Sequence, residues 1–205
     1  MNSTALFLGA GLSAAFATTS LVLGGTPLTE EERPVRAENR WALTLESAQL
    51  FGVNNPRNYH LAPQILSLAY LPSTRWSLGH LEVRSEIHLC AIAEPVLHGV
   101  ENHYFGGALR TRWTFRRANS RGEFFLDGGL GAGAIDSTDD PFGEGQDFTF
   151  TVLLGAGFRF SIDERLSVAL GILYQHLSNG GLSEPERRNT GIDAFGPSLG
   201  ILWMF

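Results

Sequence analysis

The sequence lacks several features that would indicate common protein classes. Its 205 residues include a single cysteine, Cys90, so a disulfide framework and a cysteine-based zinc cluster are both excluded. Charged residues make up 18% of the chain, below the roughly 25% of ordinary soluble domains. The net charge of −6 argues against nucleic acid as a partner, because nucleic-acid binding needs a surplus of Lys and Arg.

Long apolar runs are also missing after the N-terminal segment, where no run approaches the ~18 residues that a membrane-spanning helix needs. Residues 1–27 carry no charged side chain and include an apolar stretch, Ala5 to Val22, followed by small residues. This pattern predicts a secretory signal peptide over residues 1–25, with a membrane anchor or buried helix as the alternative. We expect residues 26–40 to form a polar periplasmic lead-in and residues 41–205 to form the folded domain.

The chain is rich in glycine and phenylalanine, and after Arg40 apolar and polar residues alternate with a period of two. The alternation predicts eight strands separated by turn residues: Trp41–Phe51, Leu61–Leu71, Leu81–Ala91, His103–Arg116, Phe124–Ala134, Phe148–Ile162, Leu166–Ser178 and Asp193–Phe205. The expected fold class is all-β.

The two faces of these strands differ sharply in chemistry. One face of the sixth strand carries large apolar residues from Phe148 to Ile162, while the opposite face carries Thr, Gly, Ser and Arg159. The polar faces of several strands bear charges that can neutralise one another inside a narrow lumen: Glu82, Arg84, Glu86, Arg110, Arg112, Asp127 and Arg159. The apolar faces must then point into lipid, which predicts an eight-stranded antiparallel transmembrane barrel of the bacterial outer membrane.

The connections favour the same fold. Short turns such as Asp163-Glu164-Arg165 alternate with longer polar segments, of which Asp136–Asp147 and Asn179–Ile192 are the clearest. In outer-membrane barrels the long loops lie outside the cell. The terminal aromatic residue, Phe205, is then expected at the periplasmic end.

Polar residues interrupt the lipid-facing set of the seventh strand at its extracellular end. His176 and Ser178 continue this face, and the outward set of the eighth strand leads up to Asp193. Antiparallel neighbours would bring Asp193 close to His176, giving a serine nucleophile, a histidine base and an orienting carboxylate. Asn179, Gly180 and Gly181 follow at once and could stabilise an oxyanion. The alternative is a pair of interfacial polar residues without catalytic function.

Three other motifs are weaker. Gly128-Gly129-Leu130-Gly131-Ala132-Gly133 is similar to a phosphate-binding loop, but no helix or Lys follows, so it is interpreted as part of a strand in a crowded barrel. Gly196-Pro197-Ser198-Leu199-Gly200 matches a hydrolase pattern but would lie within a strand, with Ser198 in the lumen. The acidic segment Asp136–Asp147, which includes Glu144, is interpreted as a solvated surface loop without calcium-site spacing. No metal site and no cofactor are expected.

The residues around the predicted site resemble the lipid A 3-O-deacylase (PagL-type) family of outer-membrane acyl hydrolases. The resemblance rests on His176-Leu177-Ser178-Asn179-Gly180-Gly181-Leu182 and on Asn189-Thr190-Gly191-Ile192-Asp193. It implies a Ser178 nucleophile, a His176 base and an oxyanion-stabilising Asn179. The family pattern has Glu where this chain has Asp193, after a shorter loop, so Glu184 and Glu186 are kept as alternative acids.

The sequence therefore predicts an outer-membrane esterase that removes the 3-position acyl chain of lipid A. The implied partners are lipid A or lipopolysaccharide in the outer leaflet and the membrane itself, and pairing with a second copy of the chain is left open. The alternatives are a non-catalytic structural or adhesion barrel, and a lipid A acyltransferase or phospholipase on a similar barrel.

Overall fold

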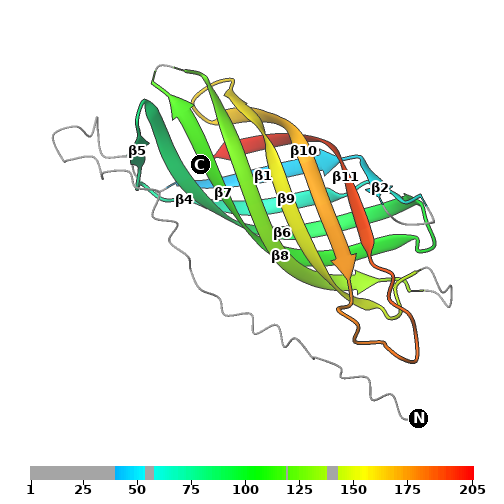
Figure 1. Ribbon diagram of the computed structural model, residues 1–205. Helices are drawn as coiled ribbons and strands as arrows, with labels where there is room; N and C mark the ends of the chain where they lie inside the picture. Colours follow the sequence, from blue (N-terminus) through cyan, green and yellow to red (C-terminus); the bar gives the residue numbers. More distant parts are fainter. Residues whose placement is uncertain (1–39, 54–57, 119, 138–142) are drawn as a thin grey trace, which may run out of the picture.

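The computed structural model describes residues 40–205 except 54–57, 119 and 138–142. The expected signal peptide and almost all of the lead-in lie outside the described residues. Every regular element within them is a β-strand (Figure 1). The strands are β1 (Arg40–Ala48), β2 (Leu50–Val53), β3 (His60–Leu61), β4 (Gln64–Leu71), β5 (Trp76–Leu78), β6 (Leu81–His98), β7 (His103–Arg117), β8 (Gly122–Ile135), β9 (Phe148–Ser161), β10 (Leu166–Ser178) and β11 (Ile192–Met204). The described part of the chain contains no helix long and apolar enough to cross a membrane.

The strands form a closed antiparallel ring, which confirms the predicted eight-stranded fold. β1 pairs with β11 at one edge and with β4 at the other, and β6 to β11 pair in chain order. β1 with β2, and β3 with β4, each occupy the place of one predicted strand. β5 adds a short hairpin on β6 outside the ring.

Three of the predicted strands are interrupted or differ from the structure by more than two residues at one end. The first two predicted strands are each interrupted, at Gln49 and at residues 62–63. Pro63 has no N–H to donate and cannot continue a ladder, which accounts for the second break. The third strand does not end at Ala91 but runs to His98 through Pro95. Pro95 lies opposite the break between β3 and β4, where its carbonyl oxygen accepts the N–H of Ala62 at 3.0 Å, so its missing N–H interrupts no regular ladder.

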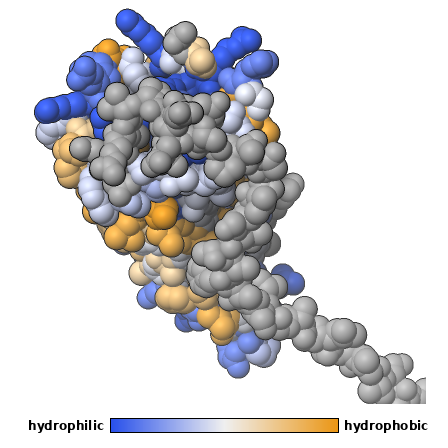
Figure 2. Space-filling model, turned by 90° about the vertical axis from the view of Figure 1, so that its left-hand side faces the viewer, coloured by the Kyte–Doolittle hydropathy of each residue, from blue (hydrophilic) through white to orange (hydrophobic). Residues whose placement is uncertain are grey.

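The outer wall is apolar, as the alternation predicts. On β9, Phe150, Leu154 and Phe158 are about half exposed, whereas Thr149, Thr151 and Arg159 between them are buried. The same alternation runs through the other ring strands, so a continuous band of large apolar side chains faces outward. Figure 2 shows part of this band below a hydrophilic end.

Charged side chains fill one half of the lumen. Arg110 forms ion pairs with Glu46 at 2.8 Å and with Asp127 at 2.6 Å, and Arg112 also reaches Asp127 at 2.6 Å. All four side chains are almost fully buried. A buried charge without a partner is strongly destabilising, and here each guanidinium faces at least one carboxylate.

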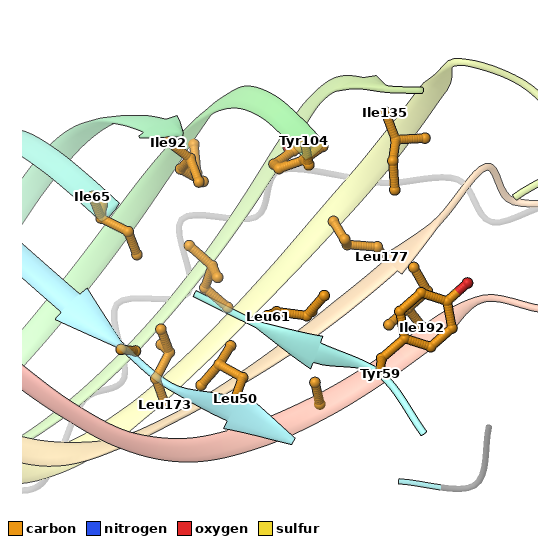
Figure 3. Packing of buried hydrophobic residues seen from close by; sticks show 14 of the residues in the cluster. Leu50, Tyr59, Leu61, Ile65, Ile92, Tyr104, Ile135, Leu173, Leu177 and Ile192 are labelled. Carbon is orange, nitrogen blue, oxygen red and sulfur yellow. The ribbon is translucent and has the colours of Figure 1, made fainter. Parts of the chain in front are cut away.

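The other half of the lumen, toward the loops that include residues 143–147 and 179–191, is apolar. Figure 3 shows Leu50, Leu61, Ile92, Leu173 and Leu177 packed together there, with Tyr59 and Tyr104. The sequence prediction placed mainly charges and glycines inside the barrel and did not identify this cluster. The apolar cluster supports the end of β10 from the inside.

Glycine on β8 allows the walls of the barrel to approach closely. A Cβ atom on Gly133 would lie 2.2 Å from the Phe105 carbonyl oxygen and 2.6 Å from Cε2 of Tyr104. Such contacts are shorter than van der Waals separation, so this position requires glycine. The glycine-rich stretch 128–133 is therefore a strand, as predicted, rather than a phosphate-binding loop.

The two ends of the barrel have different connections. At the short-turn end lie residues 72–80, 118, 120–121 and 162–165, together with both ends of the described chain, Arg40 and Phe205. At the long-loop end lie residues 58–59, 99–102, 136–137, 143–147 and 179–191.

Candidate active site

His176, Ser178 and Asp193 lie together on the outer wall at the long-loop end. His176 and Ser178 are at the end of β10, and His176 is paired in register with Asp193 at the start of β11. The side chains of His176 and Asp193 are 36% and 37% exposed. They are thus partly shielded by neighbours but open toward the side from which a lipid would approach.

A hydrogen bond orients the imidazole. Nδ1 of His176 lies 2.8 Å from Oδ1 of Asp193. The same carboxylate oxygen accepts a hydrogen bond from the Tyr174 hydroxyl at 2.5 Å. An ionised carboxylate can only accept, so Nδ1 carries the proton and Nε2 is left as the basic nitrogen.

Two donors hold the Ser178 oxygen. Nδ2 of Asn189 donates to Oγ of Ser178 at 2.9 Å, and the backbone N–H of Gly180 donates to it at 3.1 Å. Both interactions leave the hydroxyl proton of Ser178 unused. No hydrogen bond joins His176 to Ser178 among the described residues, a common arrangement in enzymes without bound substrate.

Two glycines shape the loop around these side chains. Gly180 has a φ of +67°, a left-handed conformation that directs its N–H back to Ser178. Gly191 has a φ of +66°, and a Cβ atom there would lie 3.5 Å from Cε1 of His176. The backbone therefore passes directly beside the imidazole.

The structure places the remaining predicted site residues away from the serine oxygen. The Asn179 side chain is turned into the loop, where Nδ2 donates to Ser183 and Oδ1 accepts from the N–H of Gly181. Glu184 and Glu186 are exposed on the loop surface, whereas Asp193 contacts the imidazole. Of the residues proposed for the oxyanion, the structure brings only Gly180 to Ser178.

Two side chains at the site were missed by the sequence analysis. Tyr174 shares the outward face of β10 with His176, so its position follows from the alternation, but nothing in the sequence shows that its hydroxyl reaches Asp193. Asn189 belongs to the segment that carries the family resemblance, yet nothing in a single sequence shows that a loop folds its amide onto Ser178.

A pair of buried carboxyl groups supports the loop from below. Oε2 of Glu144 accepts the backbone N–H of Asn179 at 3.2 Å, and the N–H of Glu144 donates to Glu101 at 2.7 Å. Glu101 also accepts from the Tyr59 hydroxyl at 2.5 Å. The prediction of a solvated acidic loop is therefore wrong for Glu144, which is fully buried because its loop packs under residues 179–191.

Burial and the neighbouring Glu101 raise the pKa of Glu144 to about 8. Its second oxygen has no hydrogen-bond partner. A Cβ atom on the next residue, Gly145, would lie 2.1 Å from Oγ of Ser183, so the two loops are in direct contact. The position of Asn179 thus depends on a carboxyl group in a different loop.

No group of three or more His, Cys, Asp or Glu side chains that could hold a metal ion occurs among the described residues. Ser198 is buried in the middle of β11, as predicted, and is remote from His176.

The fold and the site define a class: an outer-membrane β-barrel with a hydrolase-type group of side chains on its lipid-facing wall. A family model described as lipid A 3-O-deacylase (PagL) matches residues 47–201. The chain belongs to this family, and it is an outer-membrane lipid A deacylase.

Two solved structures are similar to this chain. The crystal structure of the outer membrane enzyme PagL matches with a TM-score of 0.52 and 18% identity, covering 79% of this chain and 98% of that chain. The structure of Neisserial surface protein A (NspA) matches with a TM-score of 0.47 and 9% identity, covering 80% and 97%. A comparison with curated proteins gives no match.

Proposed function

We propose that the protein hydrolyses the ester bond of the 3-position acyl chain of lipid A by a serine mechanism. The observation that carries the proposal is the Asp193–His176 hydrogen bond, with Ser178 two residues along the same strand and on the same face. Side chains at i and i+2 of a strand project in the same direction from Cα atoms about 6.6–7 Å apart, so rotation of Ser178 can bring its hydroxyl to Nε2.

In the first step, Nε2 of His176 takes the Ser178 proton as Oγ attacks the acyl carbonyl carbon. The imidazolium that forms is stabilised by Asp193, which stays ionised. His176 then gives the proton to the departing sugar oxygen, leaving the acyl group on Ser178. A water molecule attacks this ester with His176 again as base, releasing the fatty acid and restoring Ser178.

Asn189 and Gly180 would supply the oxyanion stabilisation. Both now donate to Oγ of Ser178, at 2.9 and 3.1 Å. When Oγ bonds to the carbonyl carbon, the carbonyl oxygen comes to lie beside Oγ and within reach of the same donors. We assign this role to Asn189 in place of Asn179, whose amide is engaged with Ser183 and Gly181.

The location of the site fits an amphiphilic substrate. With the long-loop end outside the cell, His176 and Ser178 lie at the level of the outer leaflet, where the acyl chains of lipid A can lie along the apolar wall of β9 and β10. The ester bond then meets Ser178 without entering the barrel. No cofactor takes part in these steps.

The test is mass spectrometry of lipid A from cells that express the wild type or Ser178→Ala. We expect the wild type to remove one 3-hydroxyacyl group, assigned to the 3-position by tandem fragmentation, and Ser178→Ala to remove none. Ser73→Ala, at an exposed serine in the connection after β4 at the short-turn end, is the matched control and should retain full activity. Deacylation by Ser178→Ala, or loss of an acyl chain from another position, would overturn the proposal.

A further inference from the structure

A cavity of about 420 Å³ opens at the short-turn end of the barrel, far from the candidate active site. It is lined by the start of β1, the connection after β4, the adjoining ends of β6, β7 and β9, and the turns at this end. Six arginines line it: Arg40, Arg75, Arg84, Arg116, Arg121 and Arg159. Figure 2 views the molecule from the side of this end, where hydrophilic side chains project above the apolar band.

The floor of the cavity carries no positive excess. Arg159 donates to both oxygens of Glu86 and to Glu123. Two carboxylates face one guanidinium there, so these three side chains carry a net charge of −1.

The wall of the cavity carries an excess of positive charge. Arg75, Arg84 and Arg116 all form ion pairs with one carboxylate, Glu82, at 3.1, 2.6 and 3.0 Å. Each of the four side chains is between 23% and 37% exposed, so the pairs are partly shielded from water. Three cations on one anion leave a local charge of two, and we call this cluster the arginine wall.

The remaining charges at the opening do not cancel this excess. Arg40 and Arg121 add two further cations, while Asp163 and Glu164 add two carboxylates in the turn between β9 and β10. Asp163 already accepts the N–H groups of Arg165 and Leu166, both at 2.7 Å. The Asp163 carboxylate is therefore already engaged by backbone N–H groups of its own turn.

The crowding of the arginine wall has an electrostatic cost. Partial burial and the neighbouring charges of Arg84, Arg116 and Arg40 lower the pKa of Arg75, and Glu82 offsets only part of the effect. An additional anion at this point would relieve the repulsion. The wall therefore combines space and donors with a local excess of positive charge.

We propose that the arginine wall binds a phosphate-bearing group that enters the barrel from the short-turn end. A tetrahedral phosphate offers three or four oxygens and suits donors that converge from different strands, and arginine recognises it through paired N–H groups. The volume exceeds that of a bare ion and lies within the range of ligand sites, roughly 300–1,000 Å³. The group could come from the headgroup of a phospholipid in the adjoining leaflet or from a soluble phosphate compound.

Calorimetric titration of the folded protein in a phosphate-free maltoside detergent tests this site. The two probes are inorganic phosphate and dihexanoyl phosphatidylglycerol below its micelle concentration. The double variant Arg84→Gln/Arg116→Gln should weaken binding by about tenfold or more, since it removes two charged donors. The control Arg117→Gln/Arg165→Gln makes the same charge change at exposed arginines outside the cavity and should change affinity less than about twofold.

Glu82→Gln gives a test that does not depend on loss of function. It removes the carboxylate that competes for the three guanidiniums, so phosphate should bind several-fold more tightly. Folding of the variant barrel is checked by its gel mobility with and without heating. Binding of the lipid probe alone would identify a headgroup site, and binding of phosphate by itself a site for soluble compounds. Absence of binding by both the wild type and Glu82→Gln, or equal weakening by the control pair, would overturn the proposal.

Discussion

At the scale of single residues, the acid of the site is held from two sides. Oδ1 of Asp193 accepts from His176 and from Tyr174, and the second contact restrains a carboxylate that is one methylene shorter than glutamate. Register pairing of His176 with Asp193 brings their backbones close enough for the shorter side chain to reach. The strand register thus accounts for the contact of the short Asp193 side chain with the imidazole.

Changes to this contact should separate the roles of the carboxylate and the phenol. Asp193→Asn should lower kcat by several orders of magnitude, on the order of 10⁴-fold, because an amide favours the wrong imidazole tautomer. Tyr174→Phe keeps the carboxylate and should lower kcat by roughly tenfold, as expected for one lost hydrogen bond to a charged group. Rates of acyl release from lipid A in mixed micelles measure both, and equal activity of Asp193→Asn and wild type would point to Glu184 or Glu186 as the acid.

The buried Glu144 predicts a pH dependence. Its pKa, raised to about 8 from 4.5, means that the folded protein holds this proton more tightly than the unfolded chain. Its contribution to stability is therefore present at low pH and is lost as pH rises from about 4.5 through about 8. Above that range, an ionised Glu144 would repel Glu101 beneath the Asn179 loop.

We expect Tm to fall between pH 6 and pH 9 in the wild type and to fall less in Glu144→Gln, whose neutral amide resembles the protonated acid. Thermal unfolding followed by tryptophan fluorescence measures the difference. Glu184→Gln, at an exposed glutamate in loop 179–191, is the control and should follow the wild type. Parallel curves for wild type and Glu144→Gln would show that this carboxyl group does not titrate in the range.

At the scale of the strands, position in the alternation decides what each side chain tolerates. Leu130 on β8 is 57% exposed and lies at mid-strand between Leu109 on β7 and Val152 on β9, so it faces the lipid interior. Its neighbours in sequence, Gly129 and Gly131, face the lumen. Adjacent positions on β8 therefore have different requirements: an apolar side chain where the residue faces lipid, and the absence of a side chain where it faces the crowded lumen.

Leu130→Arg should destabilise the barrel by about 2–4 kcal/mol, the cost of a cation near the bilayer midplane. Leu182→Arg, at an exposed residue of loop 179–191, makes the same substitution in water and should cost less than about 0.5 kcal/mol. Urea unfolding of both variants in lipid vesicles gives the comparison. A similar cost for the two would place Leu130 outside the hydrocarbon region.

The alternation allowed the eight strands and their outward faces to be predicted, because successive side chains of a strand point to opposite faces and every second residue therefore lies on the same face. The interruption at Pro63 and the extension of β6 through Pro95 could not be predicted in this way, since they depend on which strand lies opposite. At the site, parity located His176, Ser178 and Asp193. Loop conformation decided the rest, turning Asn179 inward and bringing Asn189 to Ser178.

At the scale of the whole molecule, the lumen and the wall have separate functions. Ion pairs such as Arg110–Asp127 fill one half of the interior, and the apolar cluster around Leu177 fills the other. The interior therefore contributes stability and holds the end of β10 in place. The candidate active site and the wall available to acyl chains lie on the outside.

The placement of His176 and Ser178 on the outer wall has a kinetic consequence. Substrate reaches the site by lateral diffusion in the bilayer, so the concentration that matters is the number of lipid A molecules per membrane area. The rate should therefore follow the mole fraction of lipid A in the bilayer rather than its amount per volume of suspension. The released fatty acid would partition into the same leaflet and compete for the same stretch of wall. Inhibition by product should accordingly increase as the membrane patch around each barrel becomes smaller.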